Sequence, residues 1–181
     1  MNTVGQISVH FNSALGEGAT FSLRIPTEIY RISEPTEAPA QDTALQLRAR
    51  HAGAHVLVAE GDRSLQTFIS ATLESAGLMV FVANDGFEAI ESAKSAQFEL
   101  ILLDLMMPKV SGIEAAQTIR ALPDYPATPI LALTALAFEN DREECLRAGM
   151  NAHIPKPITP GLLLSLALEW LDYGRQTRQL A

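Results

Sequence analysis

From residue 55 onward, short apolar segments alternate with amphipathic ones, and this alternation limits the possible folds more than any other feature. The apolar segments are typical of strands buried on both faces, and the stretches between them carry apolar residues at helical spacing. The predicted strands are 55–59, 79–83, 100–103, 130–134 and 152–154, and the predicted helices are 64–76, 86–95, 112–121, 139–148 and 160–171. This order predicts an α/β fold with a doubly wound five-stranded parallel sheet and helices on both faces.

The chain divides into four regions by composition. Residues 1–26 hold two alternating apolar stretches around a segment with Gly and Asn, which is typical of a β-hairpin. Residues 27–53 contain Pro35 and Pro39 and little strand periodicity, which predicts a linker, with a helical pattern over 43–50. Residues 54–172 form the predicted main domain, and residues 173–181 form a C-terminal tail.

The composition argues against several classes of function. A net charge of -8 without clustered Lys and Arg argues against DNA as a partner. No apolar run is long enough to cross a bilayer, and the first residues lack the pattern of a leader. We therefore expect no membrane contact and a cytoplasmic location. The single cysteine, Cys145, excludes an internal disulfide.

Polar residues follow four of the predicted strands: Glu60, Asp104, Thr134 and Lys156. Because the carboxyl ends of adjacent parallel strands meet at one edge of a sheet, these side chains are expected to converge on one small ligand. A carboxylate such as Asp104 can attack a phosphoryl donor when a cation offsets the repulsion between anions. Mg²⁺ suits that role, Lys156 would balance the charge of the transferred group, and the Thr134 hydroxyl would hydrogen-bond to it.

These segments resemble the receiver domains of response regulators and hybrid histidine kinases over roughly residues 54–172. Residues 102–112 (LLDLMMPKVSG) resemble the phosphoacceptor segment, 130–135 (ILALTA) the segment with the switch hydroxyl, and 154–157 (IPKP) the segment with the lysine. The resemblance implies a flavodoxin-like strand order, 2-1-3-4-5, with Asp104 as the phosphoacceptor. It also implies a metal ligand in the backbone carbonyl of Met106 and a cis peptide bond between Lys156 and Pro157.

Two positions leave alternatives open. The family's acidic pair after the first strand is represented here by Glu60 and Gly61, so Mg²⁺ would be held by Glu60, Asp104, the Met106 carbonyl and waters, or Asp62 would turn inward. Weaker metal binding is expected, and a pseudo-receiver that binds partners without phosphate chemistry is the alternative function. His153 matches a family position that moves with the threonine, and it is either a switch residue or a half-buried histidine.

The N-terminal segment has a resemblance of its own. Residues 5–26 resemble the last hairpin of a histidine kinase ATP-binding domain, with 16–21 (GEGATF) as its final glycine motif. The other nucleotide-binding elements are missing, which argues against an ATP-dependent kinase and leaves, at most, self-catalysed phosphoryl transfer to Asp104 and its hydrolysis. The chain looks like the tail of a hybrid kinase.

The expected partners are a kinase phosphohistidine domain or a histidine phosphotransfer protein. A homodimer through the last helix is a further expectation, because three consecutive leucines, Leu162 to Leu164, cannot all face one side of a helix.

Overall fold

The computed structural model describes residues 8–14, 18–24, 40–135 and 139–180, and the chain divides into two compact units, Met1–Thr36 and Glu37–Ala181. In the first unit, β1 (Ser8–Ala14) and β2 (Gly18–Arg24) pair antiparallel, with Ser8 opposite Arg24. The predicted hairpin is therefore confirmed. Gly16 of the glycine motif, residues 25–26 and residues 27–39 of the predicted linker lie outside the described residues.

The second unit contains the predicted parallel sheet. Its strands are β3 (His55–Ala59), β4 (Met79–Ala83), β5 (Leu100–Asp104), β6 (Ile130–Thr134) and β7 (Ala152–Pro155), all paired in parallel in the order β4-β3-β5-β6-β7. This is the order 2-1-3-4-5 that the sequence predicts. β5 and β6 are buried at every position because helices cover both of their faces, which explains their uninterrupted apolar sequences.

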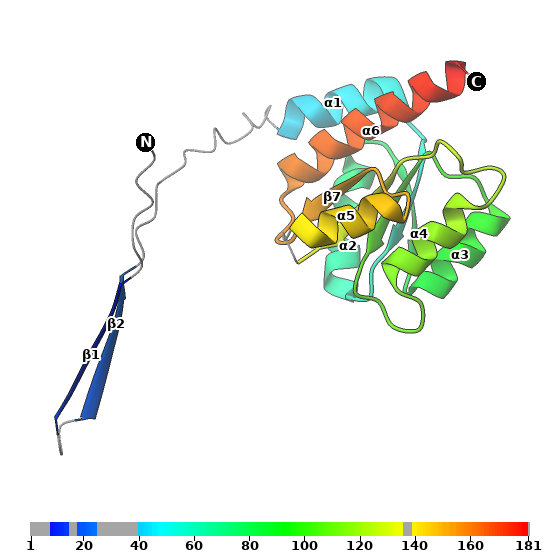
Figure 1. Ribbon diagram of the computed structural model, residues 1–181. Helices are drawn as coiled ribbons and strands as arrows, with labels where there is room; N and C mark the ends of the chain where they lie inside the picture. The colour runs from blue at the N-terminus through cyan, green and yellow to red at the C-terminus, as the bar shows by residue number, and fades with distance from the viewer. Residues whose placement is uncertain (1–7, 15–17, 25–39, 136–138, 181) are drawn as a thin grey trace, which may run out of the picture. The chain divides into compact units, whose positions relative to one another are not determined.

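Helices form a layer on each face of the sheet (Figure 1). One core cluster joins α2 (Arg63–Ser75) and α6 (Pro160–Leu180) to the face that holds Val58 and Leu102. The other joins α3 (Gly86–Ser95), α4 (Gly112–Arg120) and α5 (Glu139–Arg147) to the face that holds Leu57 and Leu103. The two faces of β5 and β6 are thus buried separately, whereas β4 at the edge of the sheet is largely exposed. The ends of the central strands remain available for a site.

Polar side chains cap the N-termini of three helices, in the loops that follow β3, β4 and β5. The Asp62 side chain accepts hydrogen bonds from the backbone N–H groups of Ser64 and Leu65, and Asp85 does the same for Glu88. At the start of α4, the Ser111 hydroxyl oxygen accepts a hydrogen bond from the Glu114 backbone N–H. The Glu114 carboxylate in turn accepts one from the Ser111 backbone N–H. Each cap satisfies otherwise unpaired backbone donors, so the loops above the sheet are short and well defined.

The structure differs from the sequence prediction at both ends of the main domain. α1 (Ala40–His51) contains the helical pattern predicted over 43–50 but belongs to the second unit and not to a linker, and α6 continues to Leu180, through most of the predicted tail. The two helices lie side by side (Figure 1), with Leu47 fully buried and Asp172 bonded to both His51 and Arg50. The sequence signal was weak because α1 buries few residues among many polar ones, so tertiary packing against α6 stabilises a helix that propensity alone leaves marginal.

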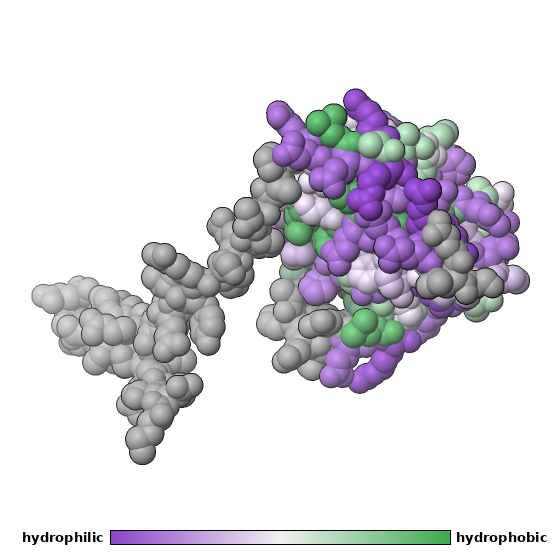
Figure 2. Space-filling view, turned by 90° about the horizontal axis from the view of Figure 1, so that it is seen from above, coloured by the Kyte–Doolittle hydropathy of each residue, from purple (hydrophilic) through white to green (hydrophobic). Residues whose placement is uncertain are grey.

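The leucines that open α6 belong mainly to the core. Leu163 and Leu164 are buried, whereas Leu162 is half-buried, so the three leucines do not all face the core equally, as their spacing predicts. The face of the second unit seen in Figure 2 is largely hydrophilic, with small separate apolar areas. Among the described residues, no helix has the length and apolar character needed to cross a membrane.

The packing of α1 leads to a stability prediction. Leu47→Ala should lower the free energy of unfolding by roughly 2–5 kcal/mol, because it opens a cavity in the core shared with α6. Leu45→Ala on the same helix removes the same atoms from a side chain that is 62% exposed, and should change stability by less than about 0.5 kcal/mol. Urea denaturation of both variants measures this. Equal effects would mean that α1 does not belong to the folded unit.

Candidate functional site

The predicted site residues meet at one edge of the sheet because of its strand register. Ala59 lies opposite Leu103 and Asp104 lies opposite Leu133, so Glu60, the residue after β3, comes beside Asp104. Thr134 ends β6 and pairs with Pro155, and its carbonyl accepts a hydrogen bond of 2.8 Å from the Lys156 backbone N–H. Four neighbouring strand ends therefore converge, as the sequence predicts.

The Lys156 ammonium group bridges the two carboxylates of the site. Its Nζ lies 2.8 Å from Glu60 Oε2 and 3.0 Å from Asp104 Oδ2. Glu60 is only 2% exposed and Asp104 6%, so both would be costly to bury as unpaired charges. The Lys156 ammonium group offsets that cost, and 22% of the Lys156 side chain stays exposed. The result is a compact cluster of two anionic groups and one cation that opens to solvent on the side of Lys156.

The pKa of Lys156 reports the balance of forces in this cluster. Burial favours the neutral amine and would lower the pKa. The hydrogen bonds to Glu60 and Asp104, together with the charges of both carboxylates, outweigh burial and raise the pKa above its ordinary value of 10.5. Lys156 therefore carries a full positive charge at neutral pH, which is the state needed to hold an anionic ligand against Asp104.

The loop between β5 and α4 packs tightly against Asp104. Its first part is held by the Met106 backbone N–H, which donates to Asp104 Oδ1 at 3.2 Å, while the Met106 side chain is 78% exposed. At the far end of the loop, a Cβ on Gly112 would collide with the Asp104 carbonyl oxygen and with Leu105. Only glycine allows this close approach, so Gly112 fixes the path of the loop that carries the Met106 carbonyl.

A second ion pair, which the sequence analysis missed, ties the same loop to α3. Lys109 Nζ lies 2.5 Å from Asp85 Oδ2, and Asp85 is buried at the N-cap of α3. Lys109 also adopts a φ of 66°, a conformation that few residues other than glycine take. The hydrogen bond to Lys109 lowers the pKa of Asp85 and raises that of Lys109. No sequence signal indicates this pairing, because its two residues lie far apart in the chain.

Gln66 is another support that the sequence analysis did not identify. Its side-chain amide donates to the Glu60 carbonyl and, at 3.2 Å, to Asn84 Oδ1. Gln66 is buried on α2, and its two hydrogen bonds link the residue after β3 to the residue after β4. It was hidden in the sequence because one polar residue inside a helical pattern is usually exposed.

Asp62 does not take the inward position that one of the two predicted alternatives requires. Asp62 is exposed and caps α2, and the backbone hydrogen bonds from Leu65 and Ser64 lower its pKa. The Glu60 carboxylate in turn accepts a hydrogen bond of 3.0 Å from the Asp62 backbone N–H. The Asp62 side chain is thus engaged in the cap and does not turn toward Asp104. At Gly61 an added Cβ would have no neighbour closer than 3.9 Å, so a larger side chain fits there.

The two expected switch residues lie on adjacent strands. Thr134 is buried at the end of β6, and His153 is half-buried on the neighbouring β7. His153 lines a cavity of about 270 Å³ together with Trp170 and Leu146. The Lys156–Pro157 peptide bond, which follows β7, is cis, as the resemblance implies.

The donor set suits one kind of metal ion. Within the described residues, no group of three or more His, Cys, Asp or Glu side chains could hold a metal ion. Glu60 and Asp104 nevertheless present two carboxylates close enough together for one cation, the Lys156 ammonium group, to contact both. Mg²⁺ typically binds through one or two carboxylates and completes its shell with water and phosphate oxygens. The residues present therefore fit Mg²⁺, whereas they do not form an all-protein cage.

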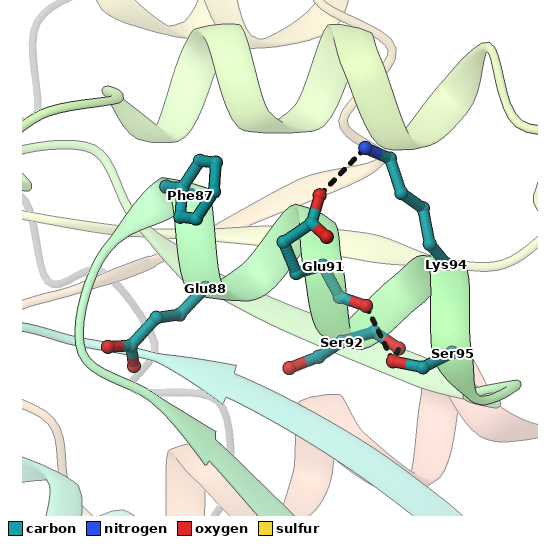
Figure 3. Close-up of a pocket in the computed structure, with 6 residues that line it drawn as sticks. All are labelled: Phe87, Glu88, Glu91, Ser92, Lys94 and Ser95. Carbon is teal, nitrogen blue, oxygen red and sulfur yellow. Dashed lines mark hydrogen bonds and ion pairs between the residues drawn. The ribbon is translucent and has the colours of Figure 1, made fainter.

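A separate hollow of about 450 Å³ lies along α3 (Figure 3). All of its lining residues, including Phe87, Glu91 and Lys94, come from this one helix, and Glu91 pairs with Lys94 at 2.7 Å. Such a surface pair contributes little energy. The hollow contains none of the strand-end residues, so it is distinct from the candidate site.

Comparison with known proteins identifies a matching family model and many similar proteins and structures. The model of the response regulator receiver domain matches residues 56–167. Signal transduction histidine-protein kinase BarA of Escherichia coli (strain K12) is 39% identical over 102 residues, 56% of this chain and 11% of BarA. Autoinducer 2 sensor kinase/phosphatase LuxQ of Vibrio vulnificus is 38% identical over 154 residues, 85% of this chain and 17% of LuxQ. The chain thus spans less than a fifth of either relative.

The solved structures match the second unit of the chain. The receiver domain of sensor histidine kinase PA1611 from Pseudomonas aeruginosa PAO1, with a magnesium ion coordinated in its active site cleft, has a TM-score of 0.63 and 38% sequence identity. The match covers 67% of this chain and 99% of that domain. Chemotaxis protein CheY4 of Vibrio cholerae has a TM-score of 0.64 and 34% identity, covering 66% of this chain and 99% of CheY4.

The fold and the cluster at its strand ends define a receiver-type α/β domain. The chain belongs to the response regulator receiver domain family. Its relatives include the receiver domains of hybrid histidine kinases, and receivers of this family act in two-component phosphorelays, in which aspartate phosphorylation and Mg²⁺ binding are general.

The ion-pair cluster leads to a prediction about pH. In Glu60→Gln, the pKa of Lys156 should fall, because one of the two hydrogen bonds that raise it is weakened while burial remains. Nitrogen-15 NMR of the lysine side chains measures this. Because the pKa of Lys156 is raised in the folded state, protonated Lys156 stabilises the wild type. This stabilisation is fully present below pH 10.5 and is lost as the pH rises through the folded-state pKa. The control is Glu91→Gln, which removes an exposed carboxylate that pairs with Lys94. An unchanged Lys156 pKa in Glu60→Gln would contradict the bridging arrangement.

Proposed function

We propose that this chain is a phosphoacceptor receiver that takes a phosphoryl group from a phosphohistidine onto Asp104. The observation that carries this proposal is the position of Lys156 Nζ, 3.0 Å from Asp104 Oδ2 and 2.8 Å from Glu60 Oε2 at adjoining strand ends. This geometry places a cation beside a carboxylate nucleophile, at a point that solvent can reach. The cytoplasm is the compartment that fits such a phosphorelay.

The proposed chemistry assigns one role to each residue. An Asp104 carboxylate oxygen forms a bond to phosphorus while the bond between phosphorus and the donor imidazole nitrogen breaks, and the electron pair of that bond stays with the imidazole. Lys156 balances the charge of the transferred group, and the Thr134 hydroxyl donates to one of its oxygens. Glu60, Asp104 and the Met106 carbonyl would hold Mg²⁺, which supplies charge neutralisation when bound.

The proposed consequence of phosphorylation is a change of surface. A phosphoryl group that draws the Thr134 hydroxyl toward Asp104 would alter the packing next to it, where His153 stands on the adjacent strand. The segment from 135 to 149 and the start of α6 would then shift between two states. A phosphohistidine domain or a histidine phosphotransfer protein is the proposed partner, and association through α6 into a homodimer is a weaker proposal, since α1 already covers part of that helix.

The N-terminal hairpin fits a piece of a longer hybrid kinase. The match to LuxQ covers 85% of this chain, which is more than the 56–167 segment that the receiver model matches. The glycine-containing sequence 16–21 and the hairpin pairing of β1 with β2 agree with the end of an ATP-binding domain. An isolated hairpin is marginal in water, so it would gain stability from the rest of such a domain.

The direct test of this function is phosphorylation by acetyl phosphate. The wild-type chain should gain one phosphoryl group in a Mg²⁺-dependent reaction, read by intact mass spectrometry, and Asp104→Asn should gain none. The comparisons support this active receiver and give no support to a pseudo-receiver. Failure of the wild type to gain mass at high Mg²⁺ concentration would overturn the proposal.

Gly61 provides a second test, of the metal site itself. Gly61→Asp should tighten Mg²⁺ binding by roughly tenfold or more, because it adds a carboxylate at a position with room for a side chain. Gly61→Asn has nearly the same shape without the charge, so it should give a much smaller gain. Titration of Mg²⁺ followed by amide NMR shifts measures both. A gain from asparagine equal to that from aspartate would show that backbone rigidity, not a missing ligand, limits metal binding.

A further inference from the structure

Three arginines gather in a pocket at the edge of the sheet opposite to Asp104. Arg50, Arg175 and Arg178 line a cavity of about 340 Å³ with His51 and Glu99. Arg50 and His51 end α1, and the other two arginines lie near the end of α6. β3 starts near this pocket and ends near Glu60, so five residues, roughly 16 Å of strand, separate the pocket from the phosphoacceptor site.

The charge of this pocket is opposite to that of the chain as a whole. The chain has a net charge of -8, yet the pocket lining holds three guanidinium groups and a single carboxylate, that of Glu99. Glu99 Oε2 already accepts a hydrogen bond of 2.6 Å from the His55 backbone N–H. Within the described part of the chain, Arg178 has no ion-pair partner. Asp172 pairs with Arg50, so Arg175 and Arg178 supply the positive charge that no ion pair among the described residues offsets.

Contacts between the two helices hold the rim of the pocket in place. Asp172 Oδ2 lies 2.6 Å from Arg50 Nη2, and Asp172 Oδ1 lies 2.8 Å from His51 Nε2, whose side chain is 7% exposed. Arg175 Nη1 donates to the Arg50 carbonyl at 3.3 Å. Basic residues often end helices because they complement the helix dipole, but that effect does not require side chains of two helices to face one cavity.

The pocket is built from parts of the chain that the receiver fold does not need. The family model matches residues 56–167, and Arg50, His51, Arg175 and Arg178 all lie outside that segment. The same two helical extensions, α1 and the end of α6, are the elements that the sequence analysis took for linker and tail. Their packing therefore creates a site that is separate from the phosphoacceptor.

We propose that this pocket binds a multiply charged phosphate group, supplied as free pyrophosphate or as the phosphates of a nucleotide. Guanidinium groups present parallel N–H donors that match phosphate oxygens in pairs. The volume lies in the range of small-molecule sites. A bound anion would contact α1 and α6 together and so strengthen their pairing.

Pyrophosphate titration of the full chain without Mg²⁺ tests this proposal. Amide NMR should show saturable shifts at Gly53, which lines the pocket, and at Arg178, and binding should weaken as salt is raised. Arg175→Gln with Arg178→Gln should lower the affinity at least tenfold. The matched control is Lys94→Gln with Arg147→Gln, which removes the same charge from two exposed residues that pair within their own helices, and it should change the affinity less than twofold.

Further measurements identify the source of the phosphate and distinguish this pocket from the phosphoacceptor site at Asp104. Tighter binding of ADP than of pyrophosphate would assign a nucleotide, and equal binding would assign the phosphate group alone; both support the proposal. The absence of saturable shifts at Gly53 and Arg178, or an equal loss in the control pair, would overturn it. Lys156→Met should leave the Gly53 shift unchanged, and Arg175→Gln with Arg178→Gln should leave Asp104 phosphorylation unchanged, so the two proposals fail independently.

Discussion

The Lys156 ammonium group between Glu60 and Asp104 is the interaction on which the site depends. Glu60 is 2% exposed and Asp104 is 6% exposed, and the Lys156 ammonium group offsets the cost of burying both negative charges. The parallel sheet brings the two strand ends together, and the backbone hydrogen bond from Lys156 to the Thr134 carbonyl fixes the third. Two buried carboxylates and the cation that they share thus meet because of strand order and register.

The surrounding loops keep this cluster in a narrow range of geometries. Gly112 lets α4 approach the Asp104 backbone, and the Lys109–Asp85 ion pair connects the same loop to α3. Gln66 supports the Glu60 carbonyl from α2. Each support comes from a different helix, so the position of Asp104 is determined by several packed elements and not by its own loop. Such preorganisation is what a site that acts by charge placement requires.

Much of the fold could be predicted from sequence because its strands are buried on both faces. The uninterrupted apolar stretch before Asp104 predicts a buried strand, and the polar residues at the strand ends predict the group of side chains that the structure brings together. α1 could not be recognised as part of the domain, since Leu47 gains its burial only from α6. Asp62 was open to two interpretations, and its capping of α2 decides between them. Lys109 pairs with Asp85, which is distant in sequence, and Gln66 acts through a buried side-chain amide on a helix, a placement that no local pattern reveals.

The two ends of the sheet therefore carry opposite kinds of cluster: a paired acidic one at Asp104 and a basic one between the ends of α1 and α6. The central claim is that the first cluster directs phosphoryl transfer to a single carboxylate. Tandem mass spectrometry of peptides from the chain treated with acetyl phosphate and Mg²⁺ tests this claim most directly. The account predicts a hydroxylamine-labile phosphoryl group on Asp104 alone. A phosphoryl group on Glu60, on Asp85 or on a hydroxyl side chain would contradict it.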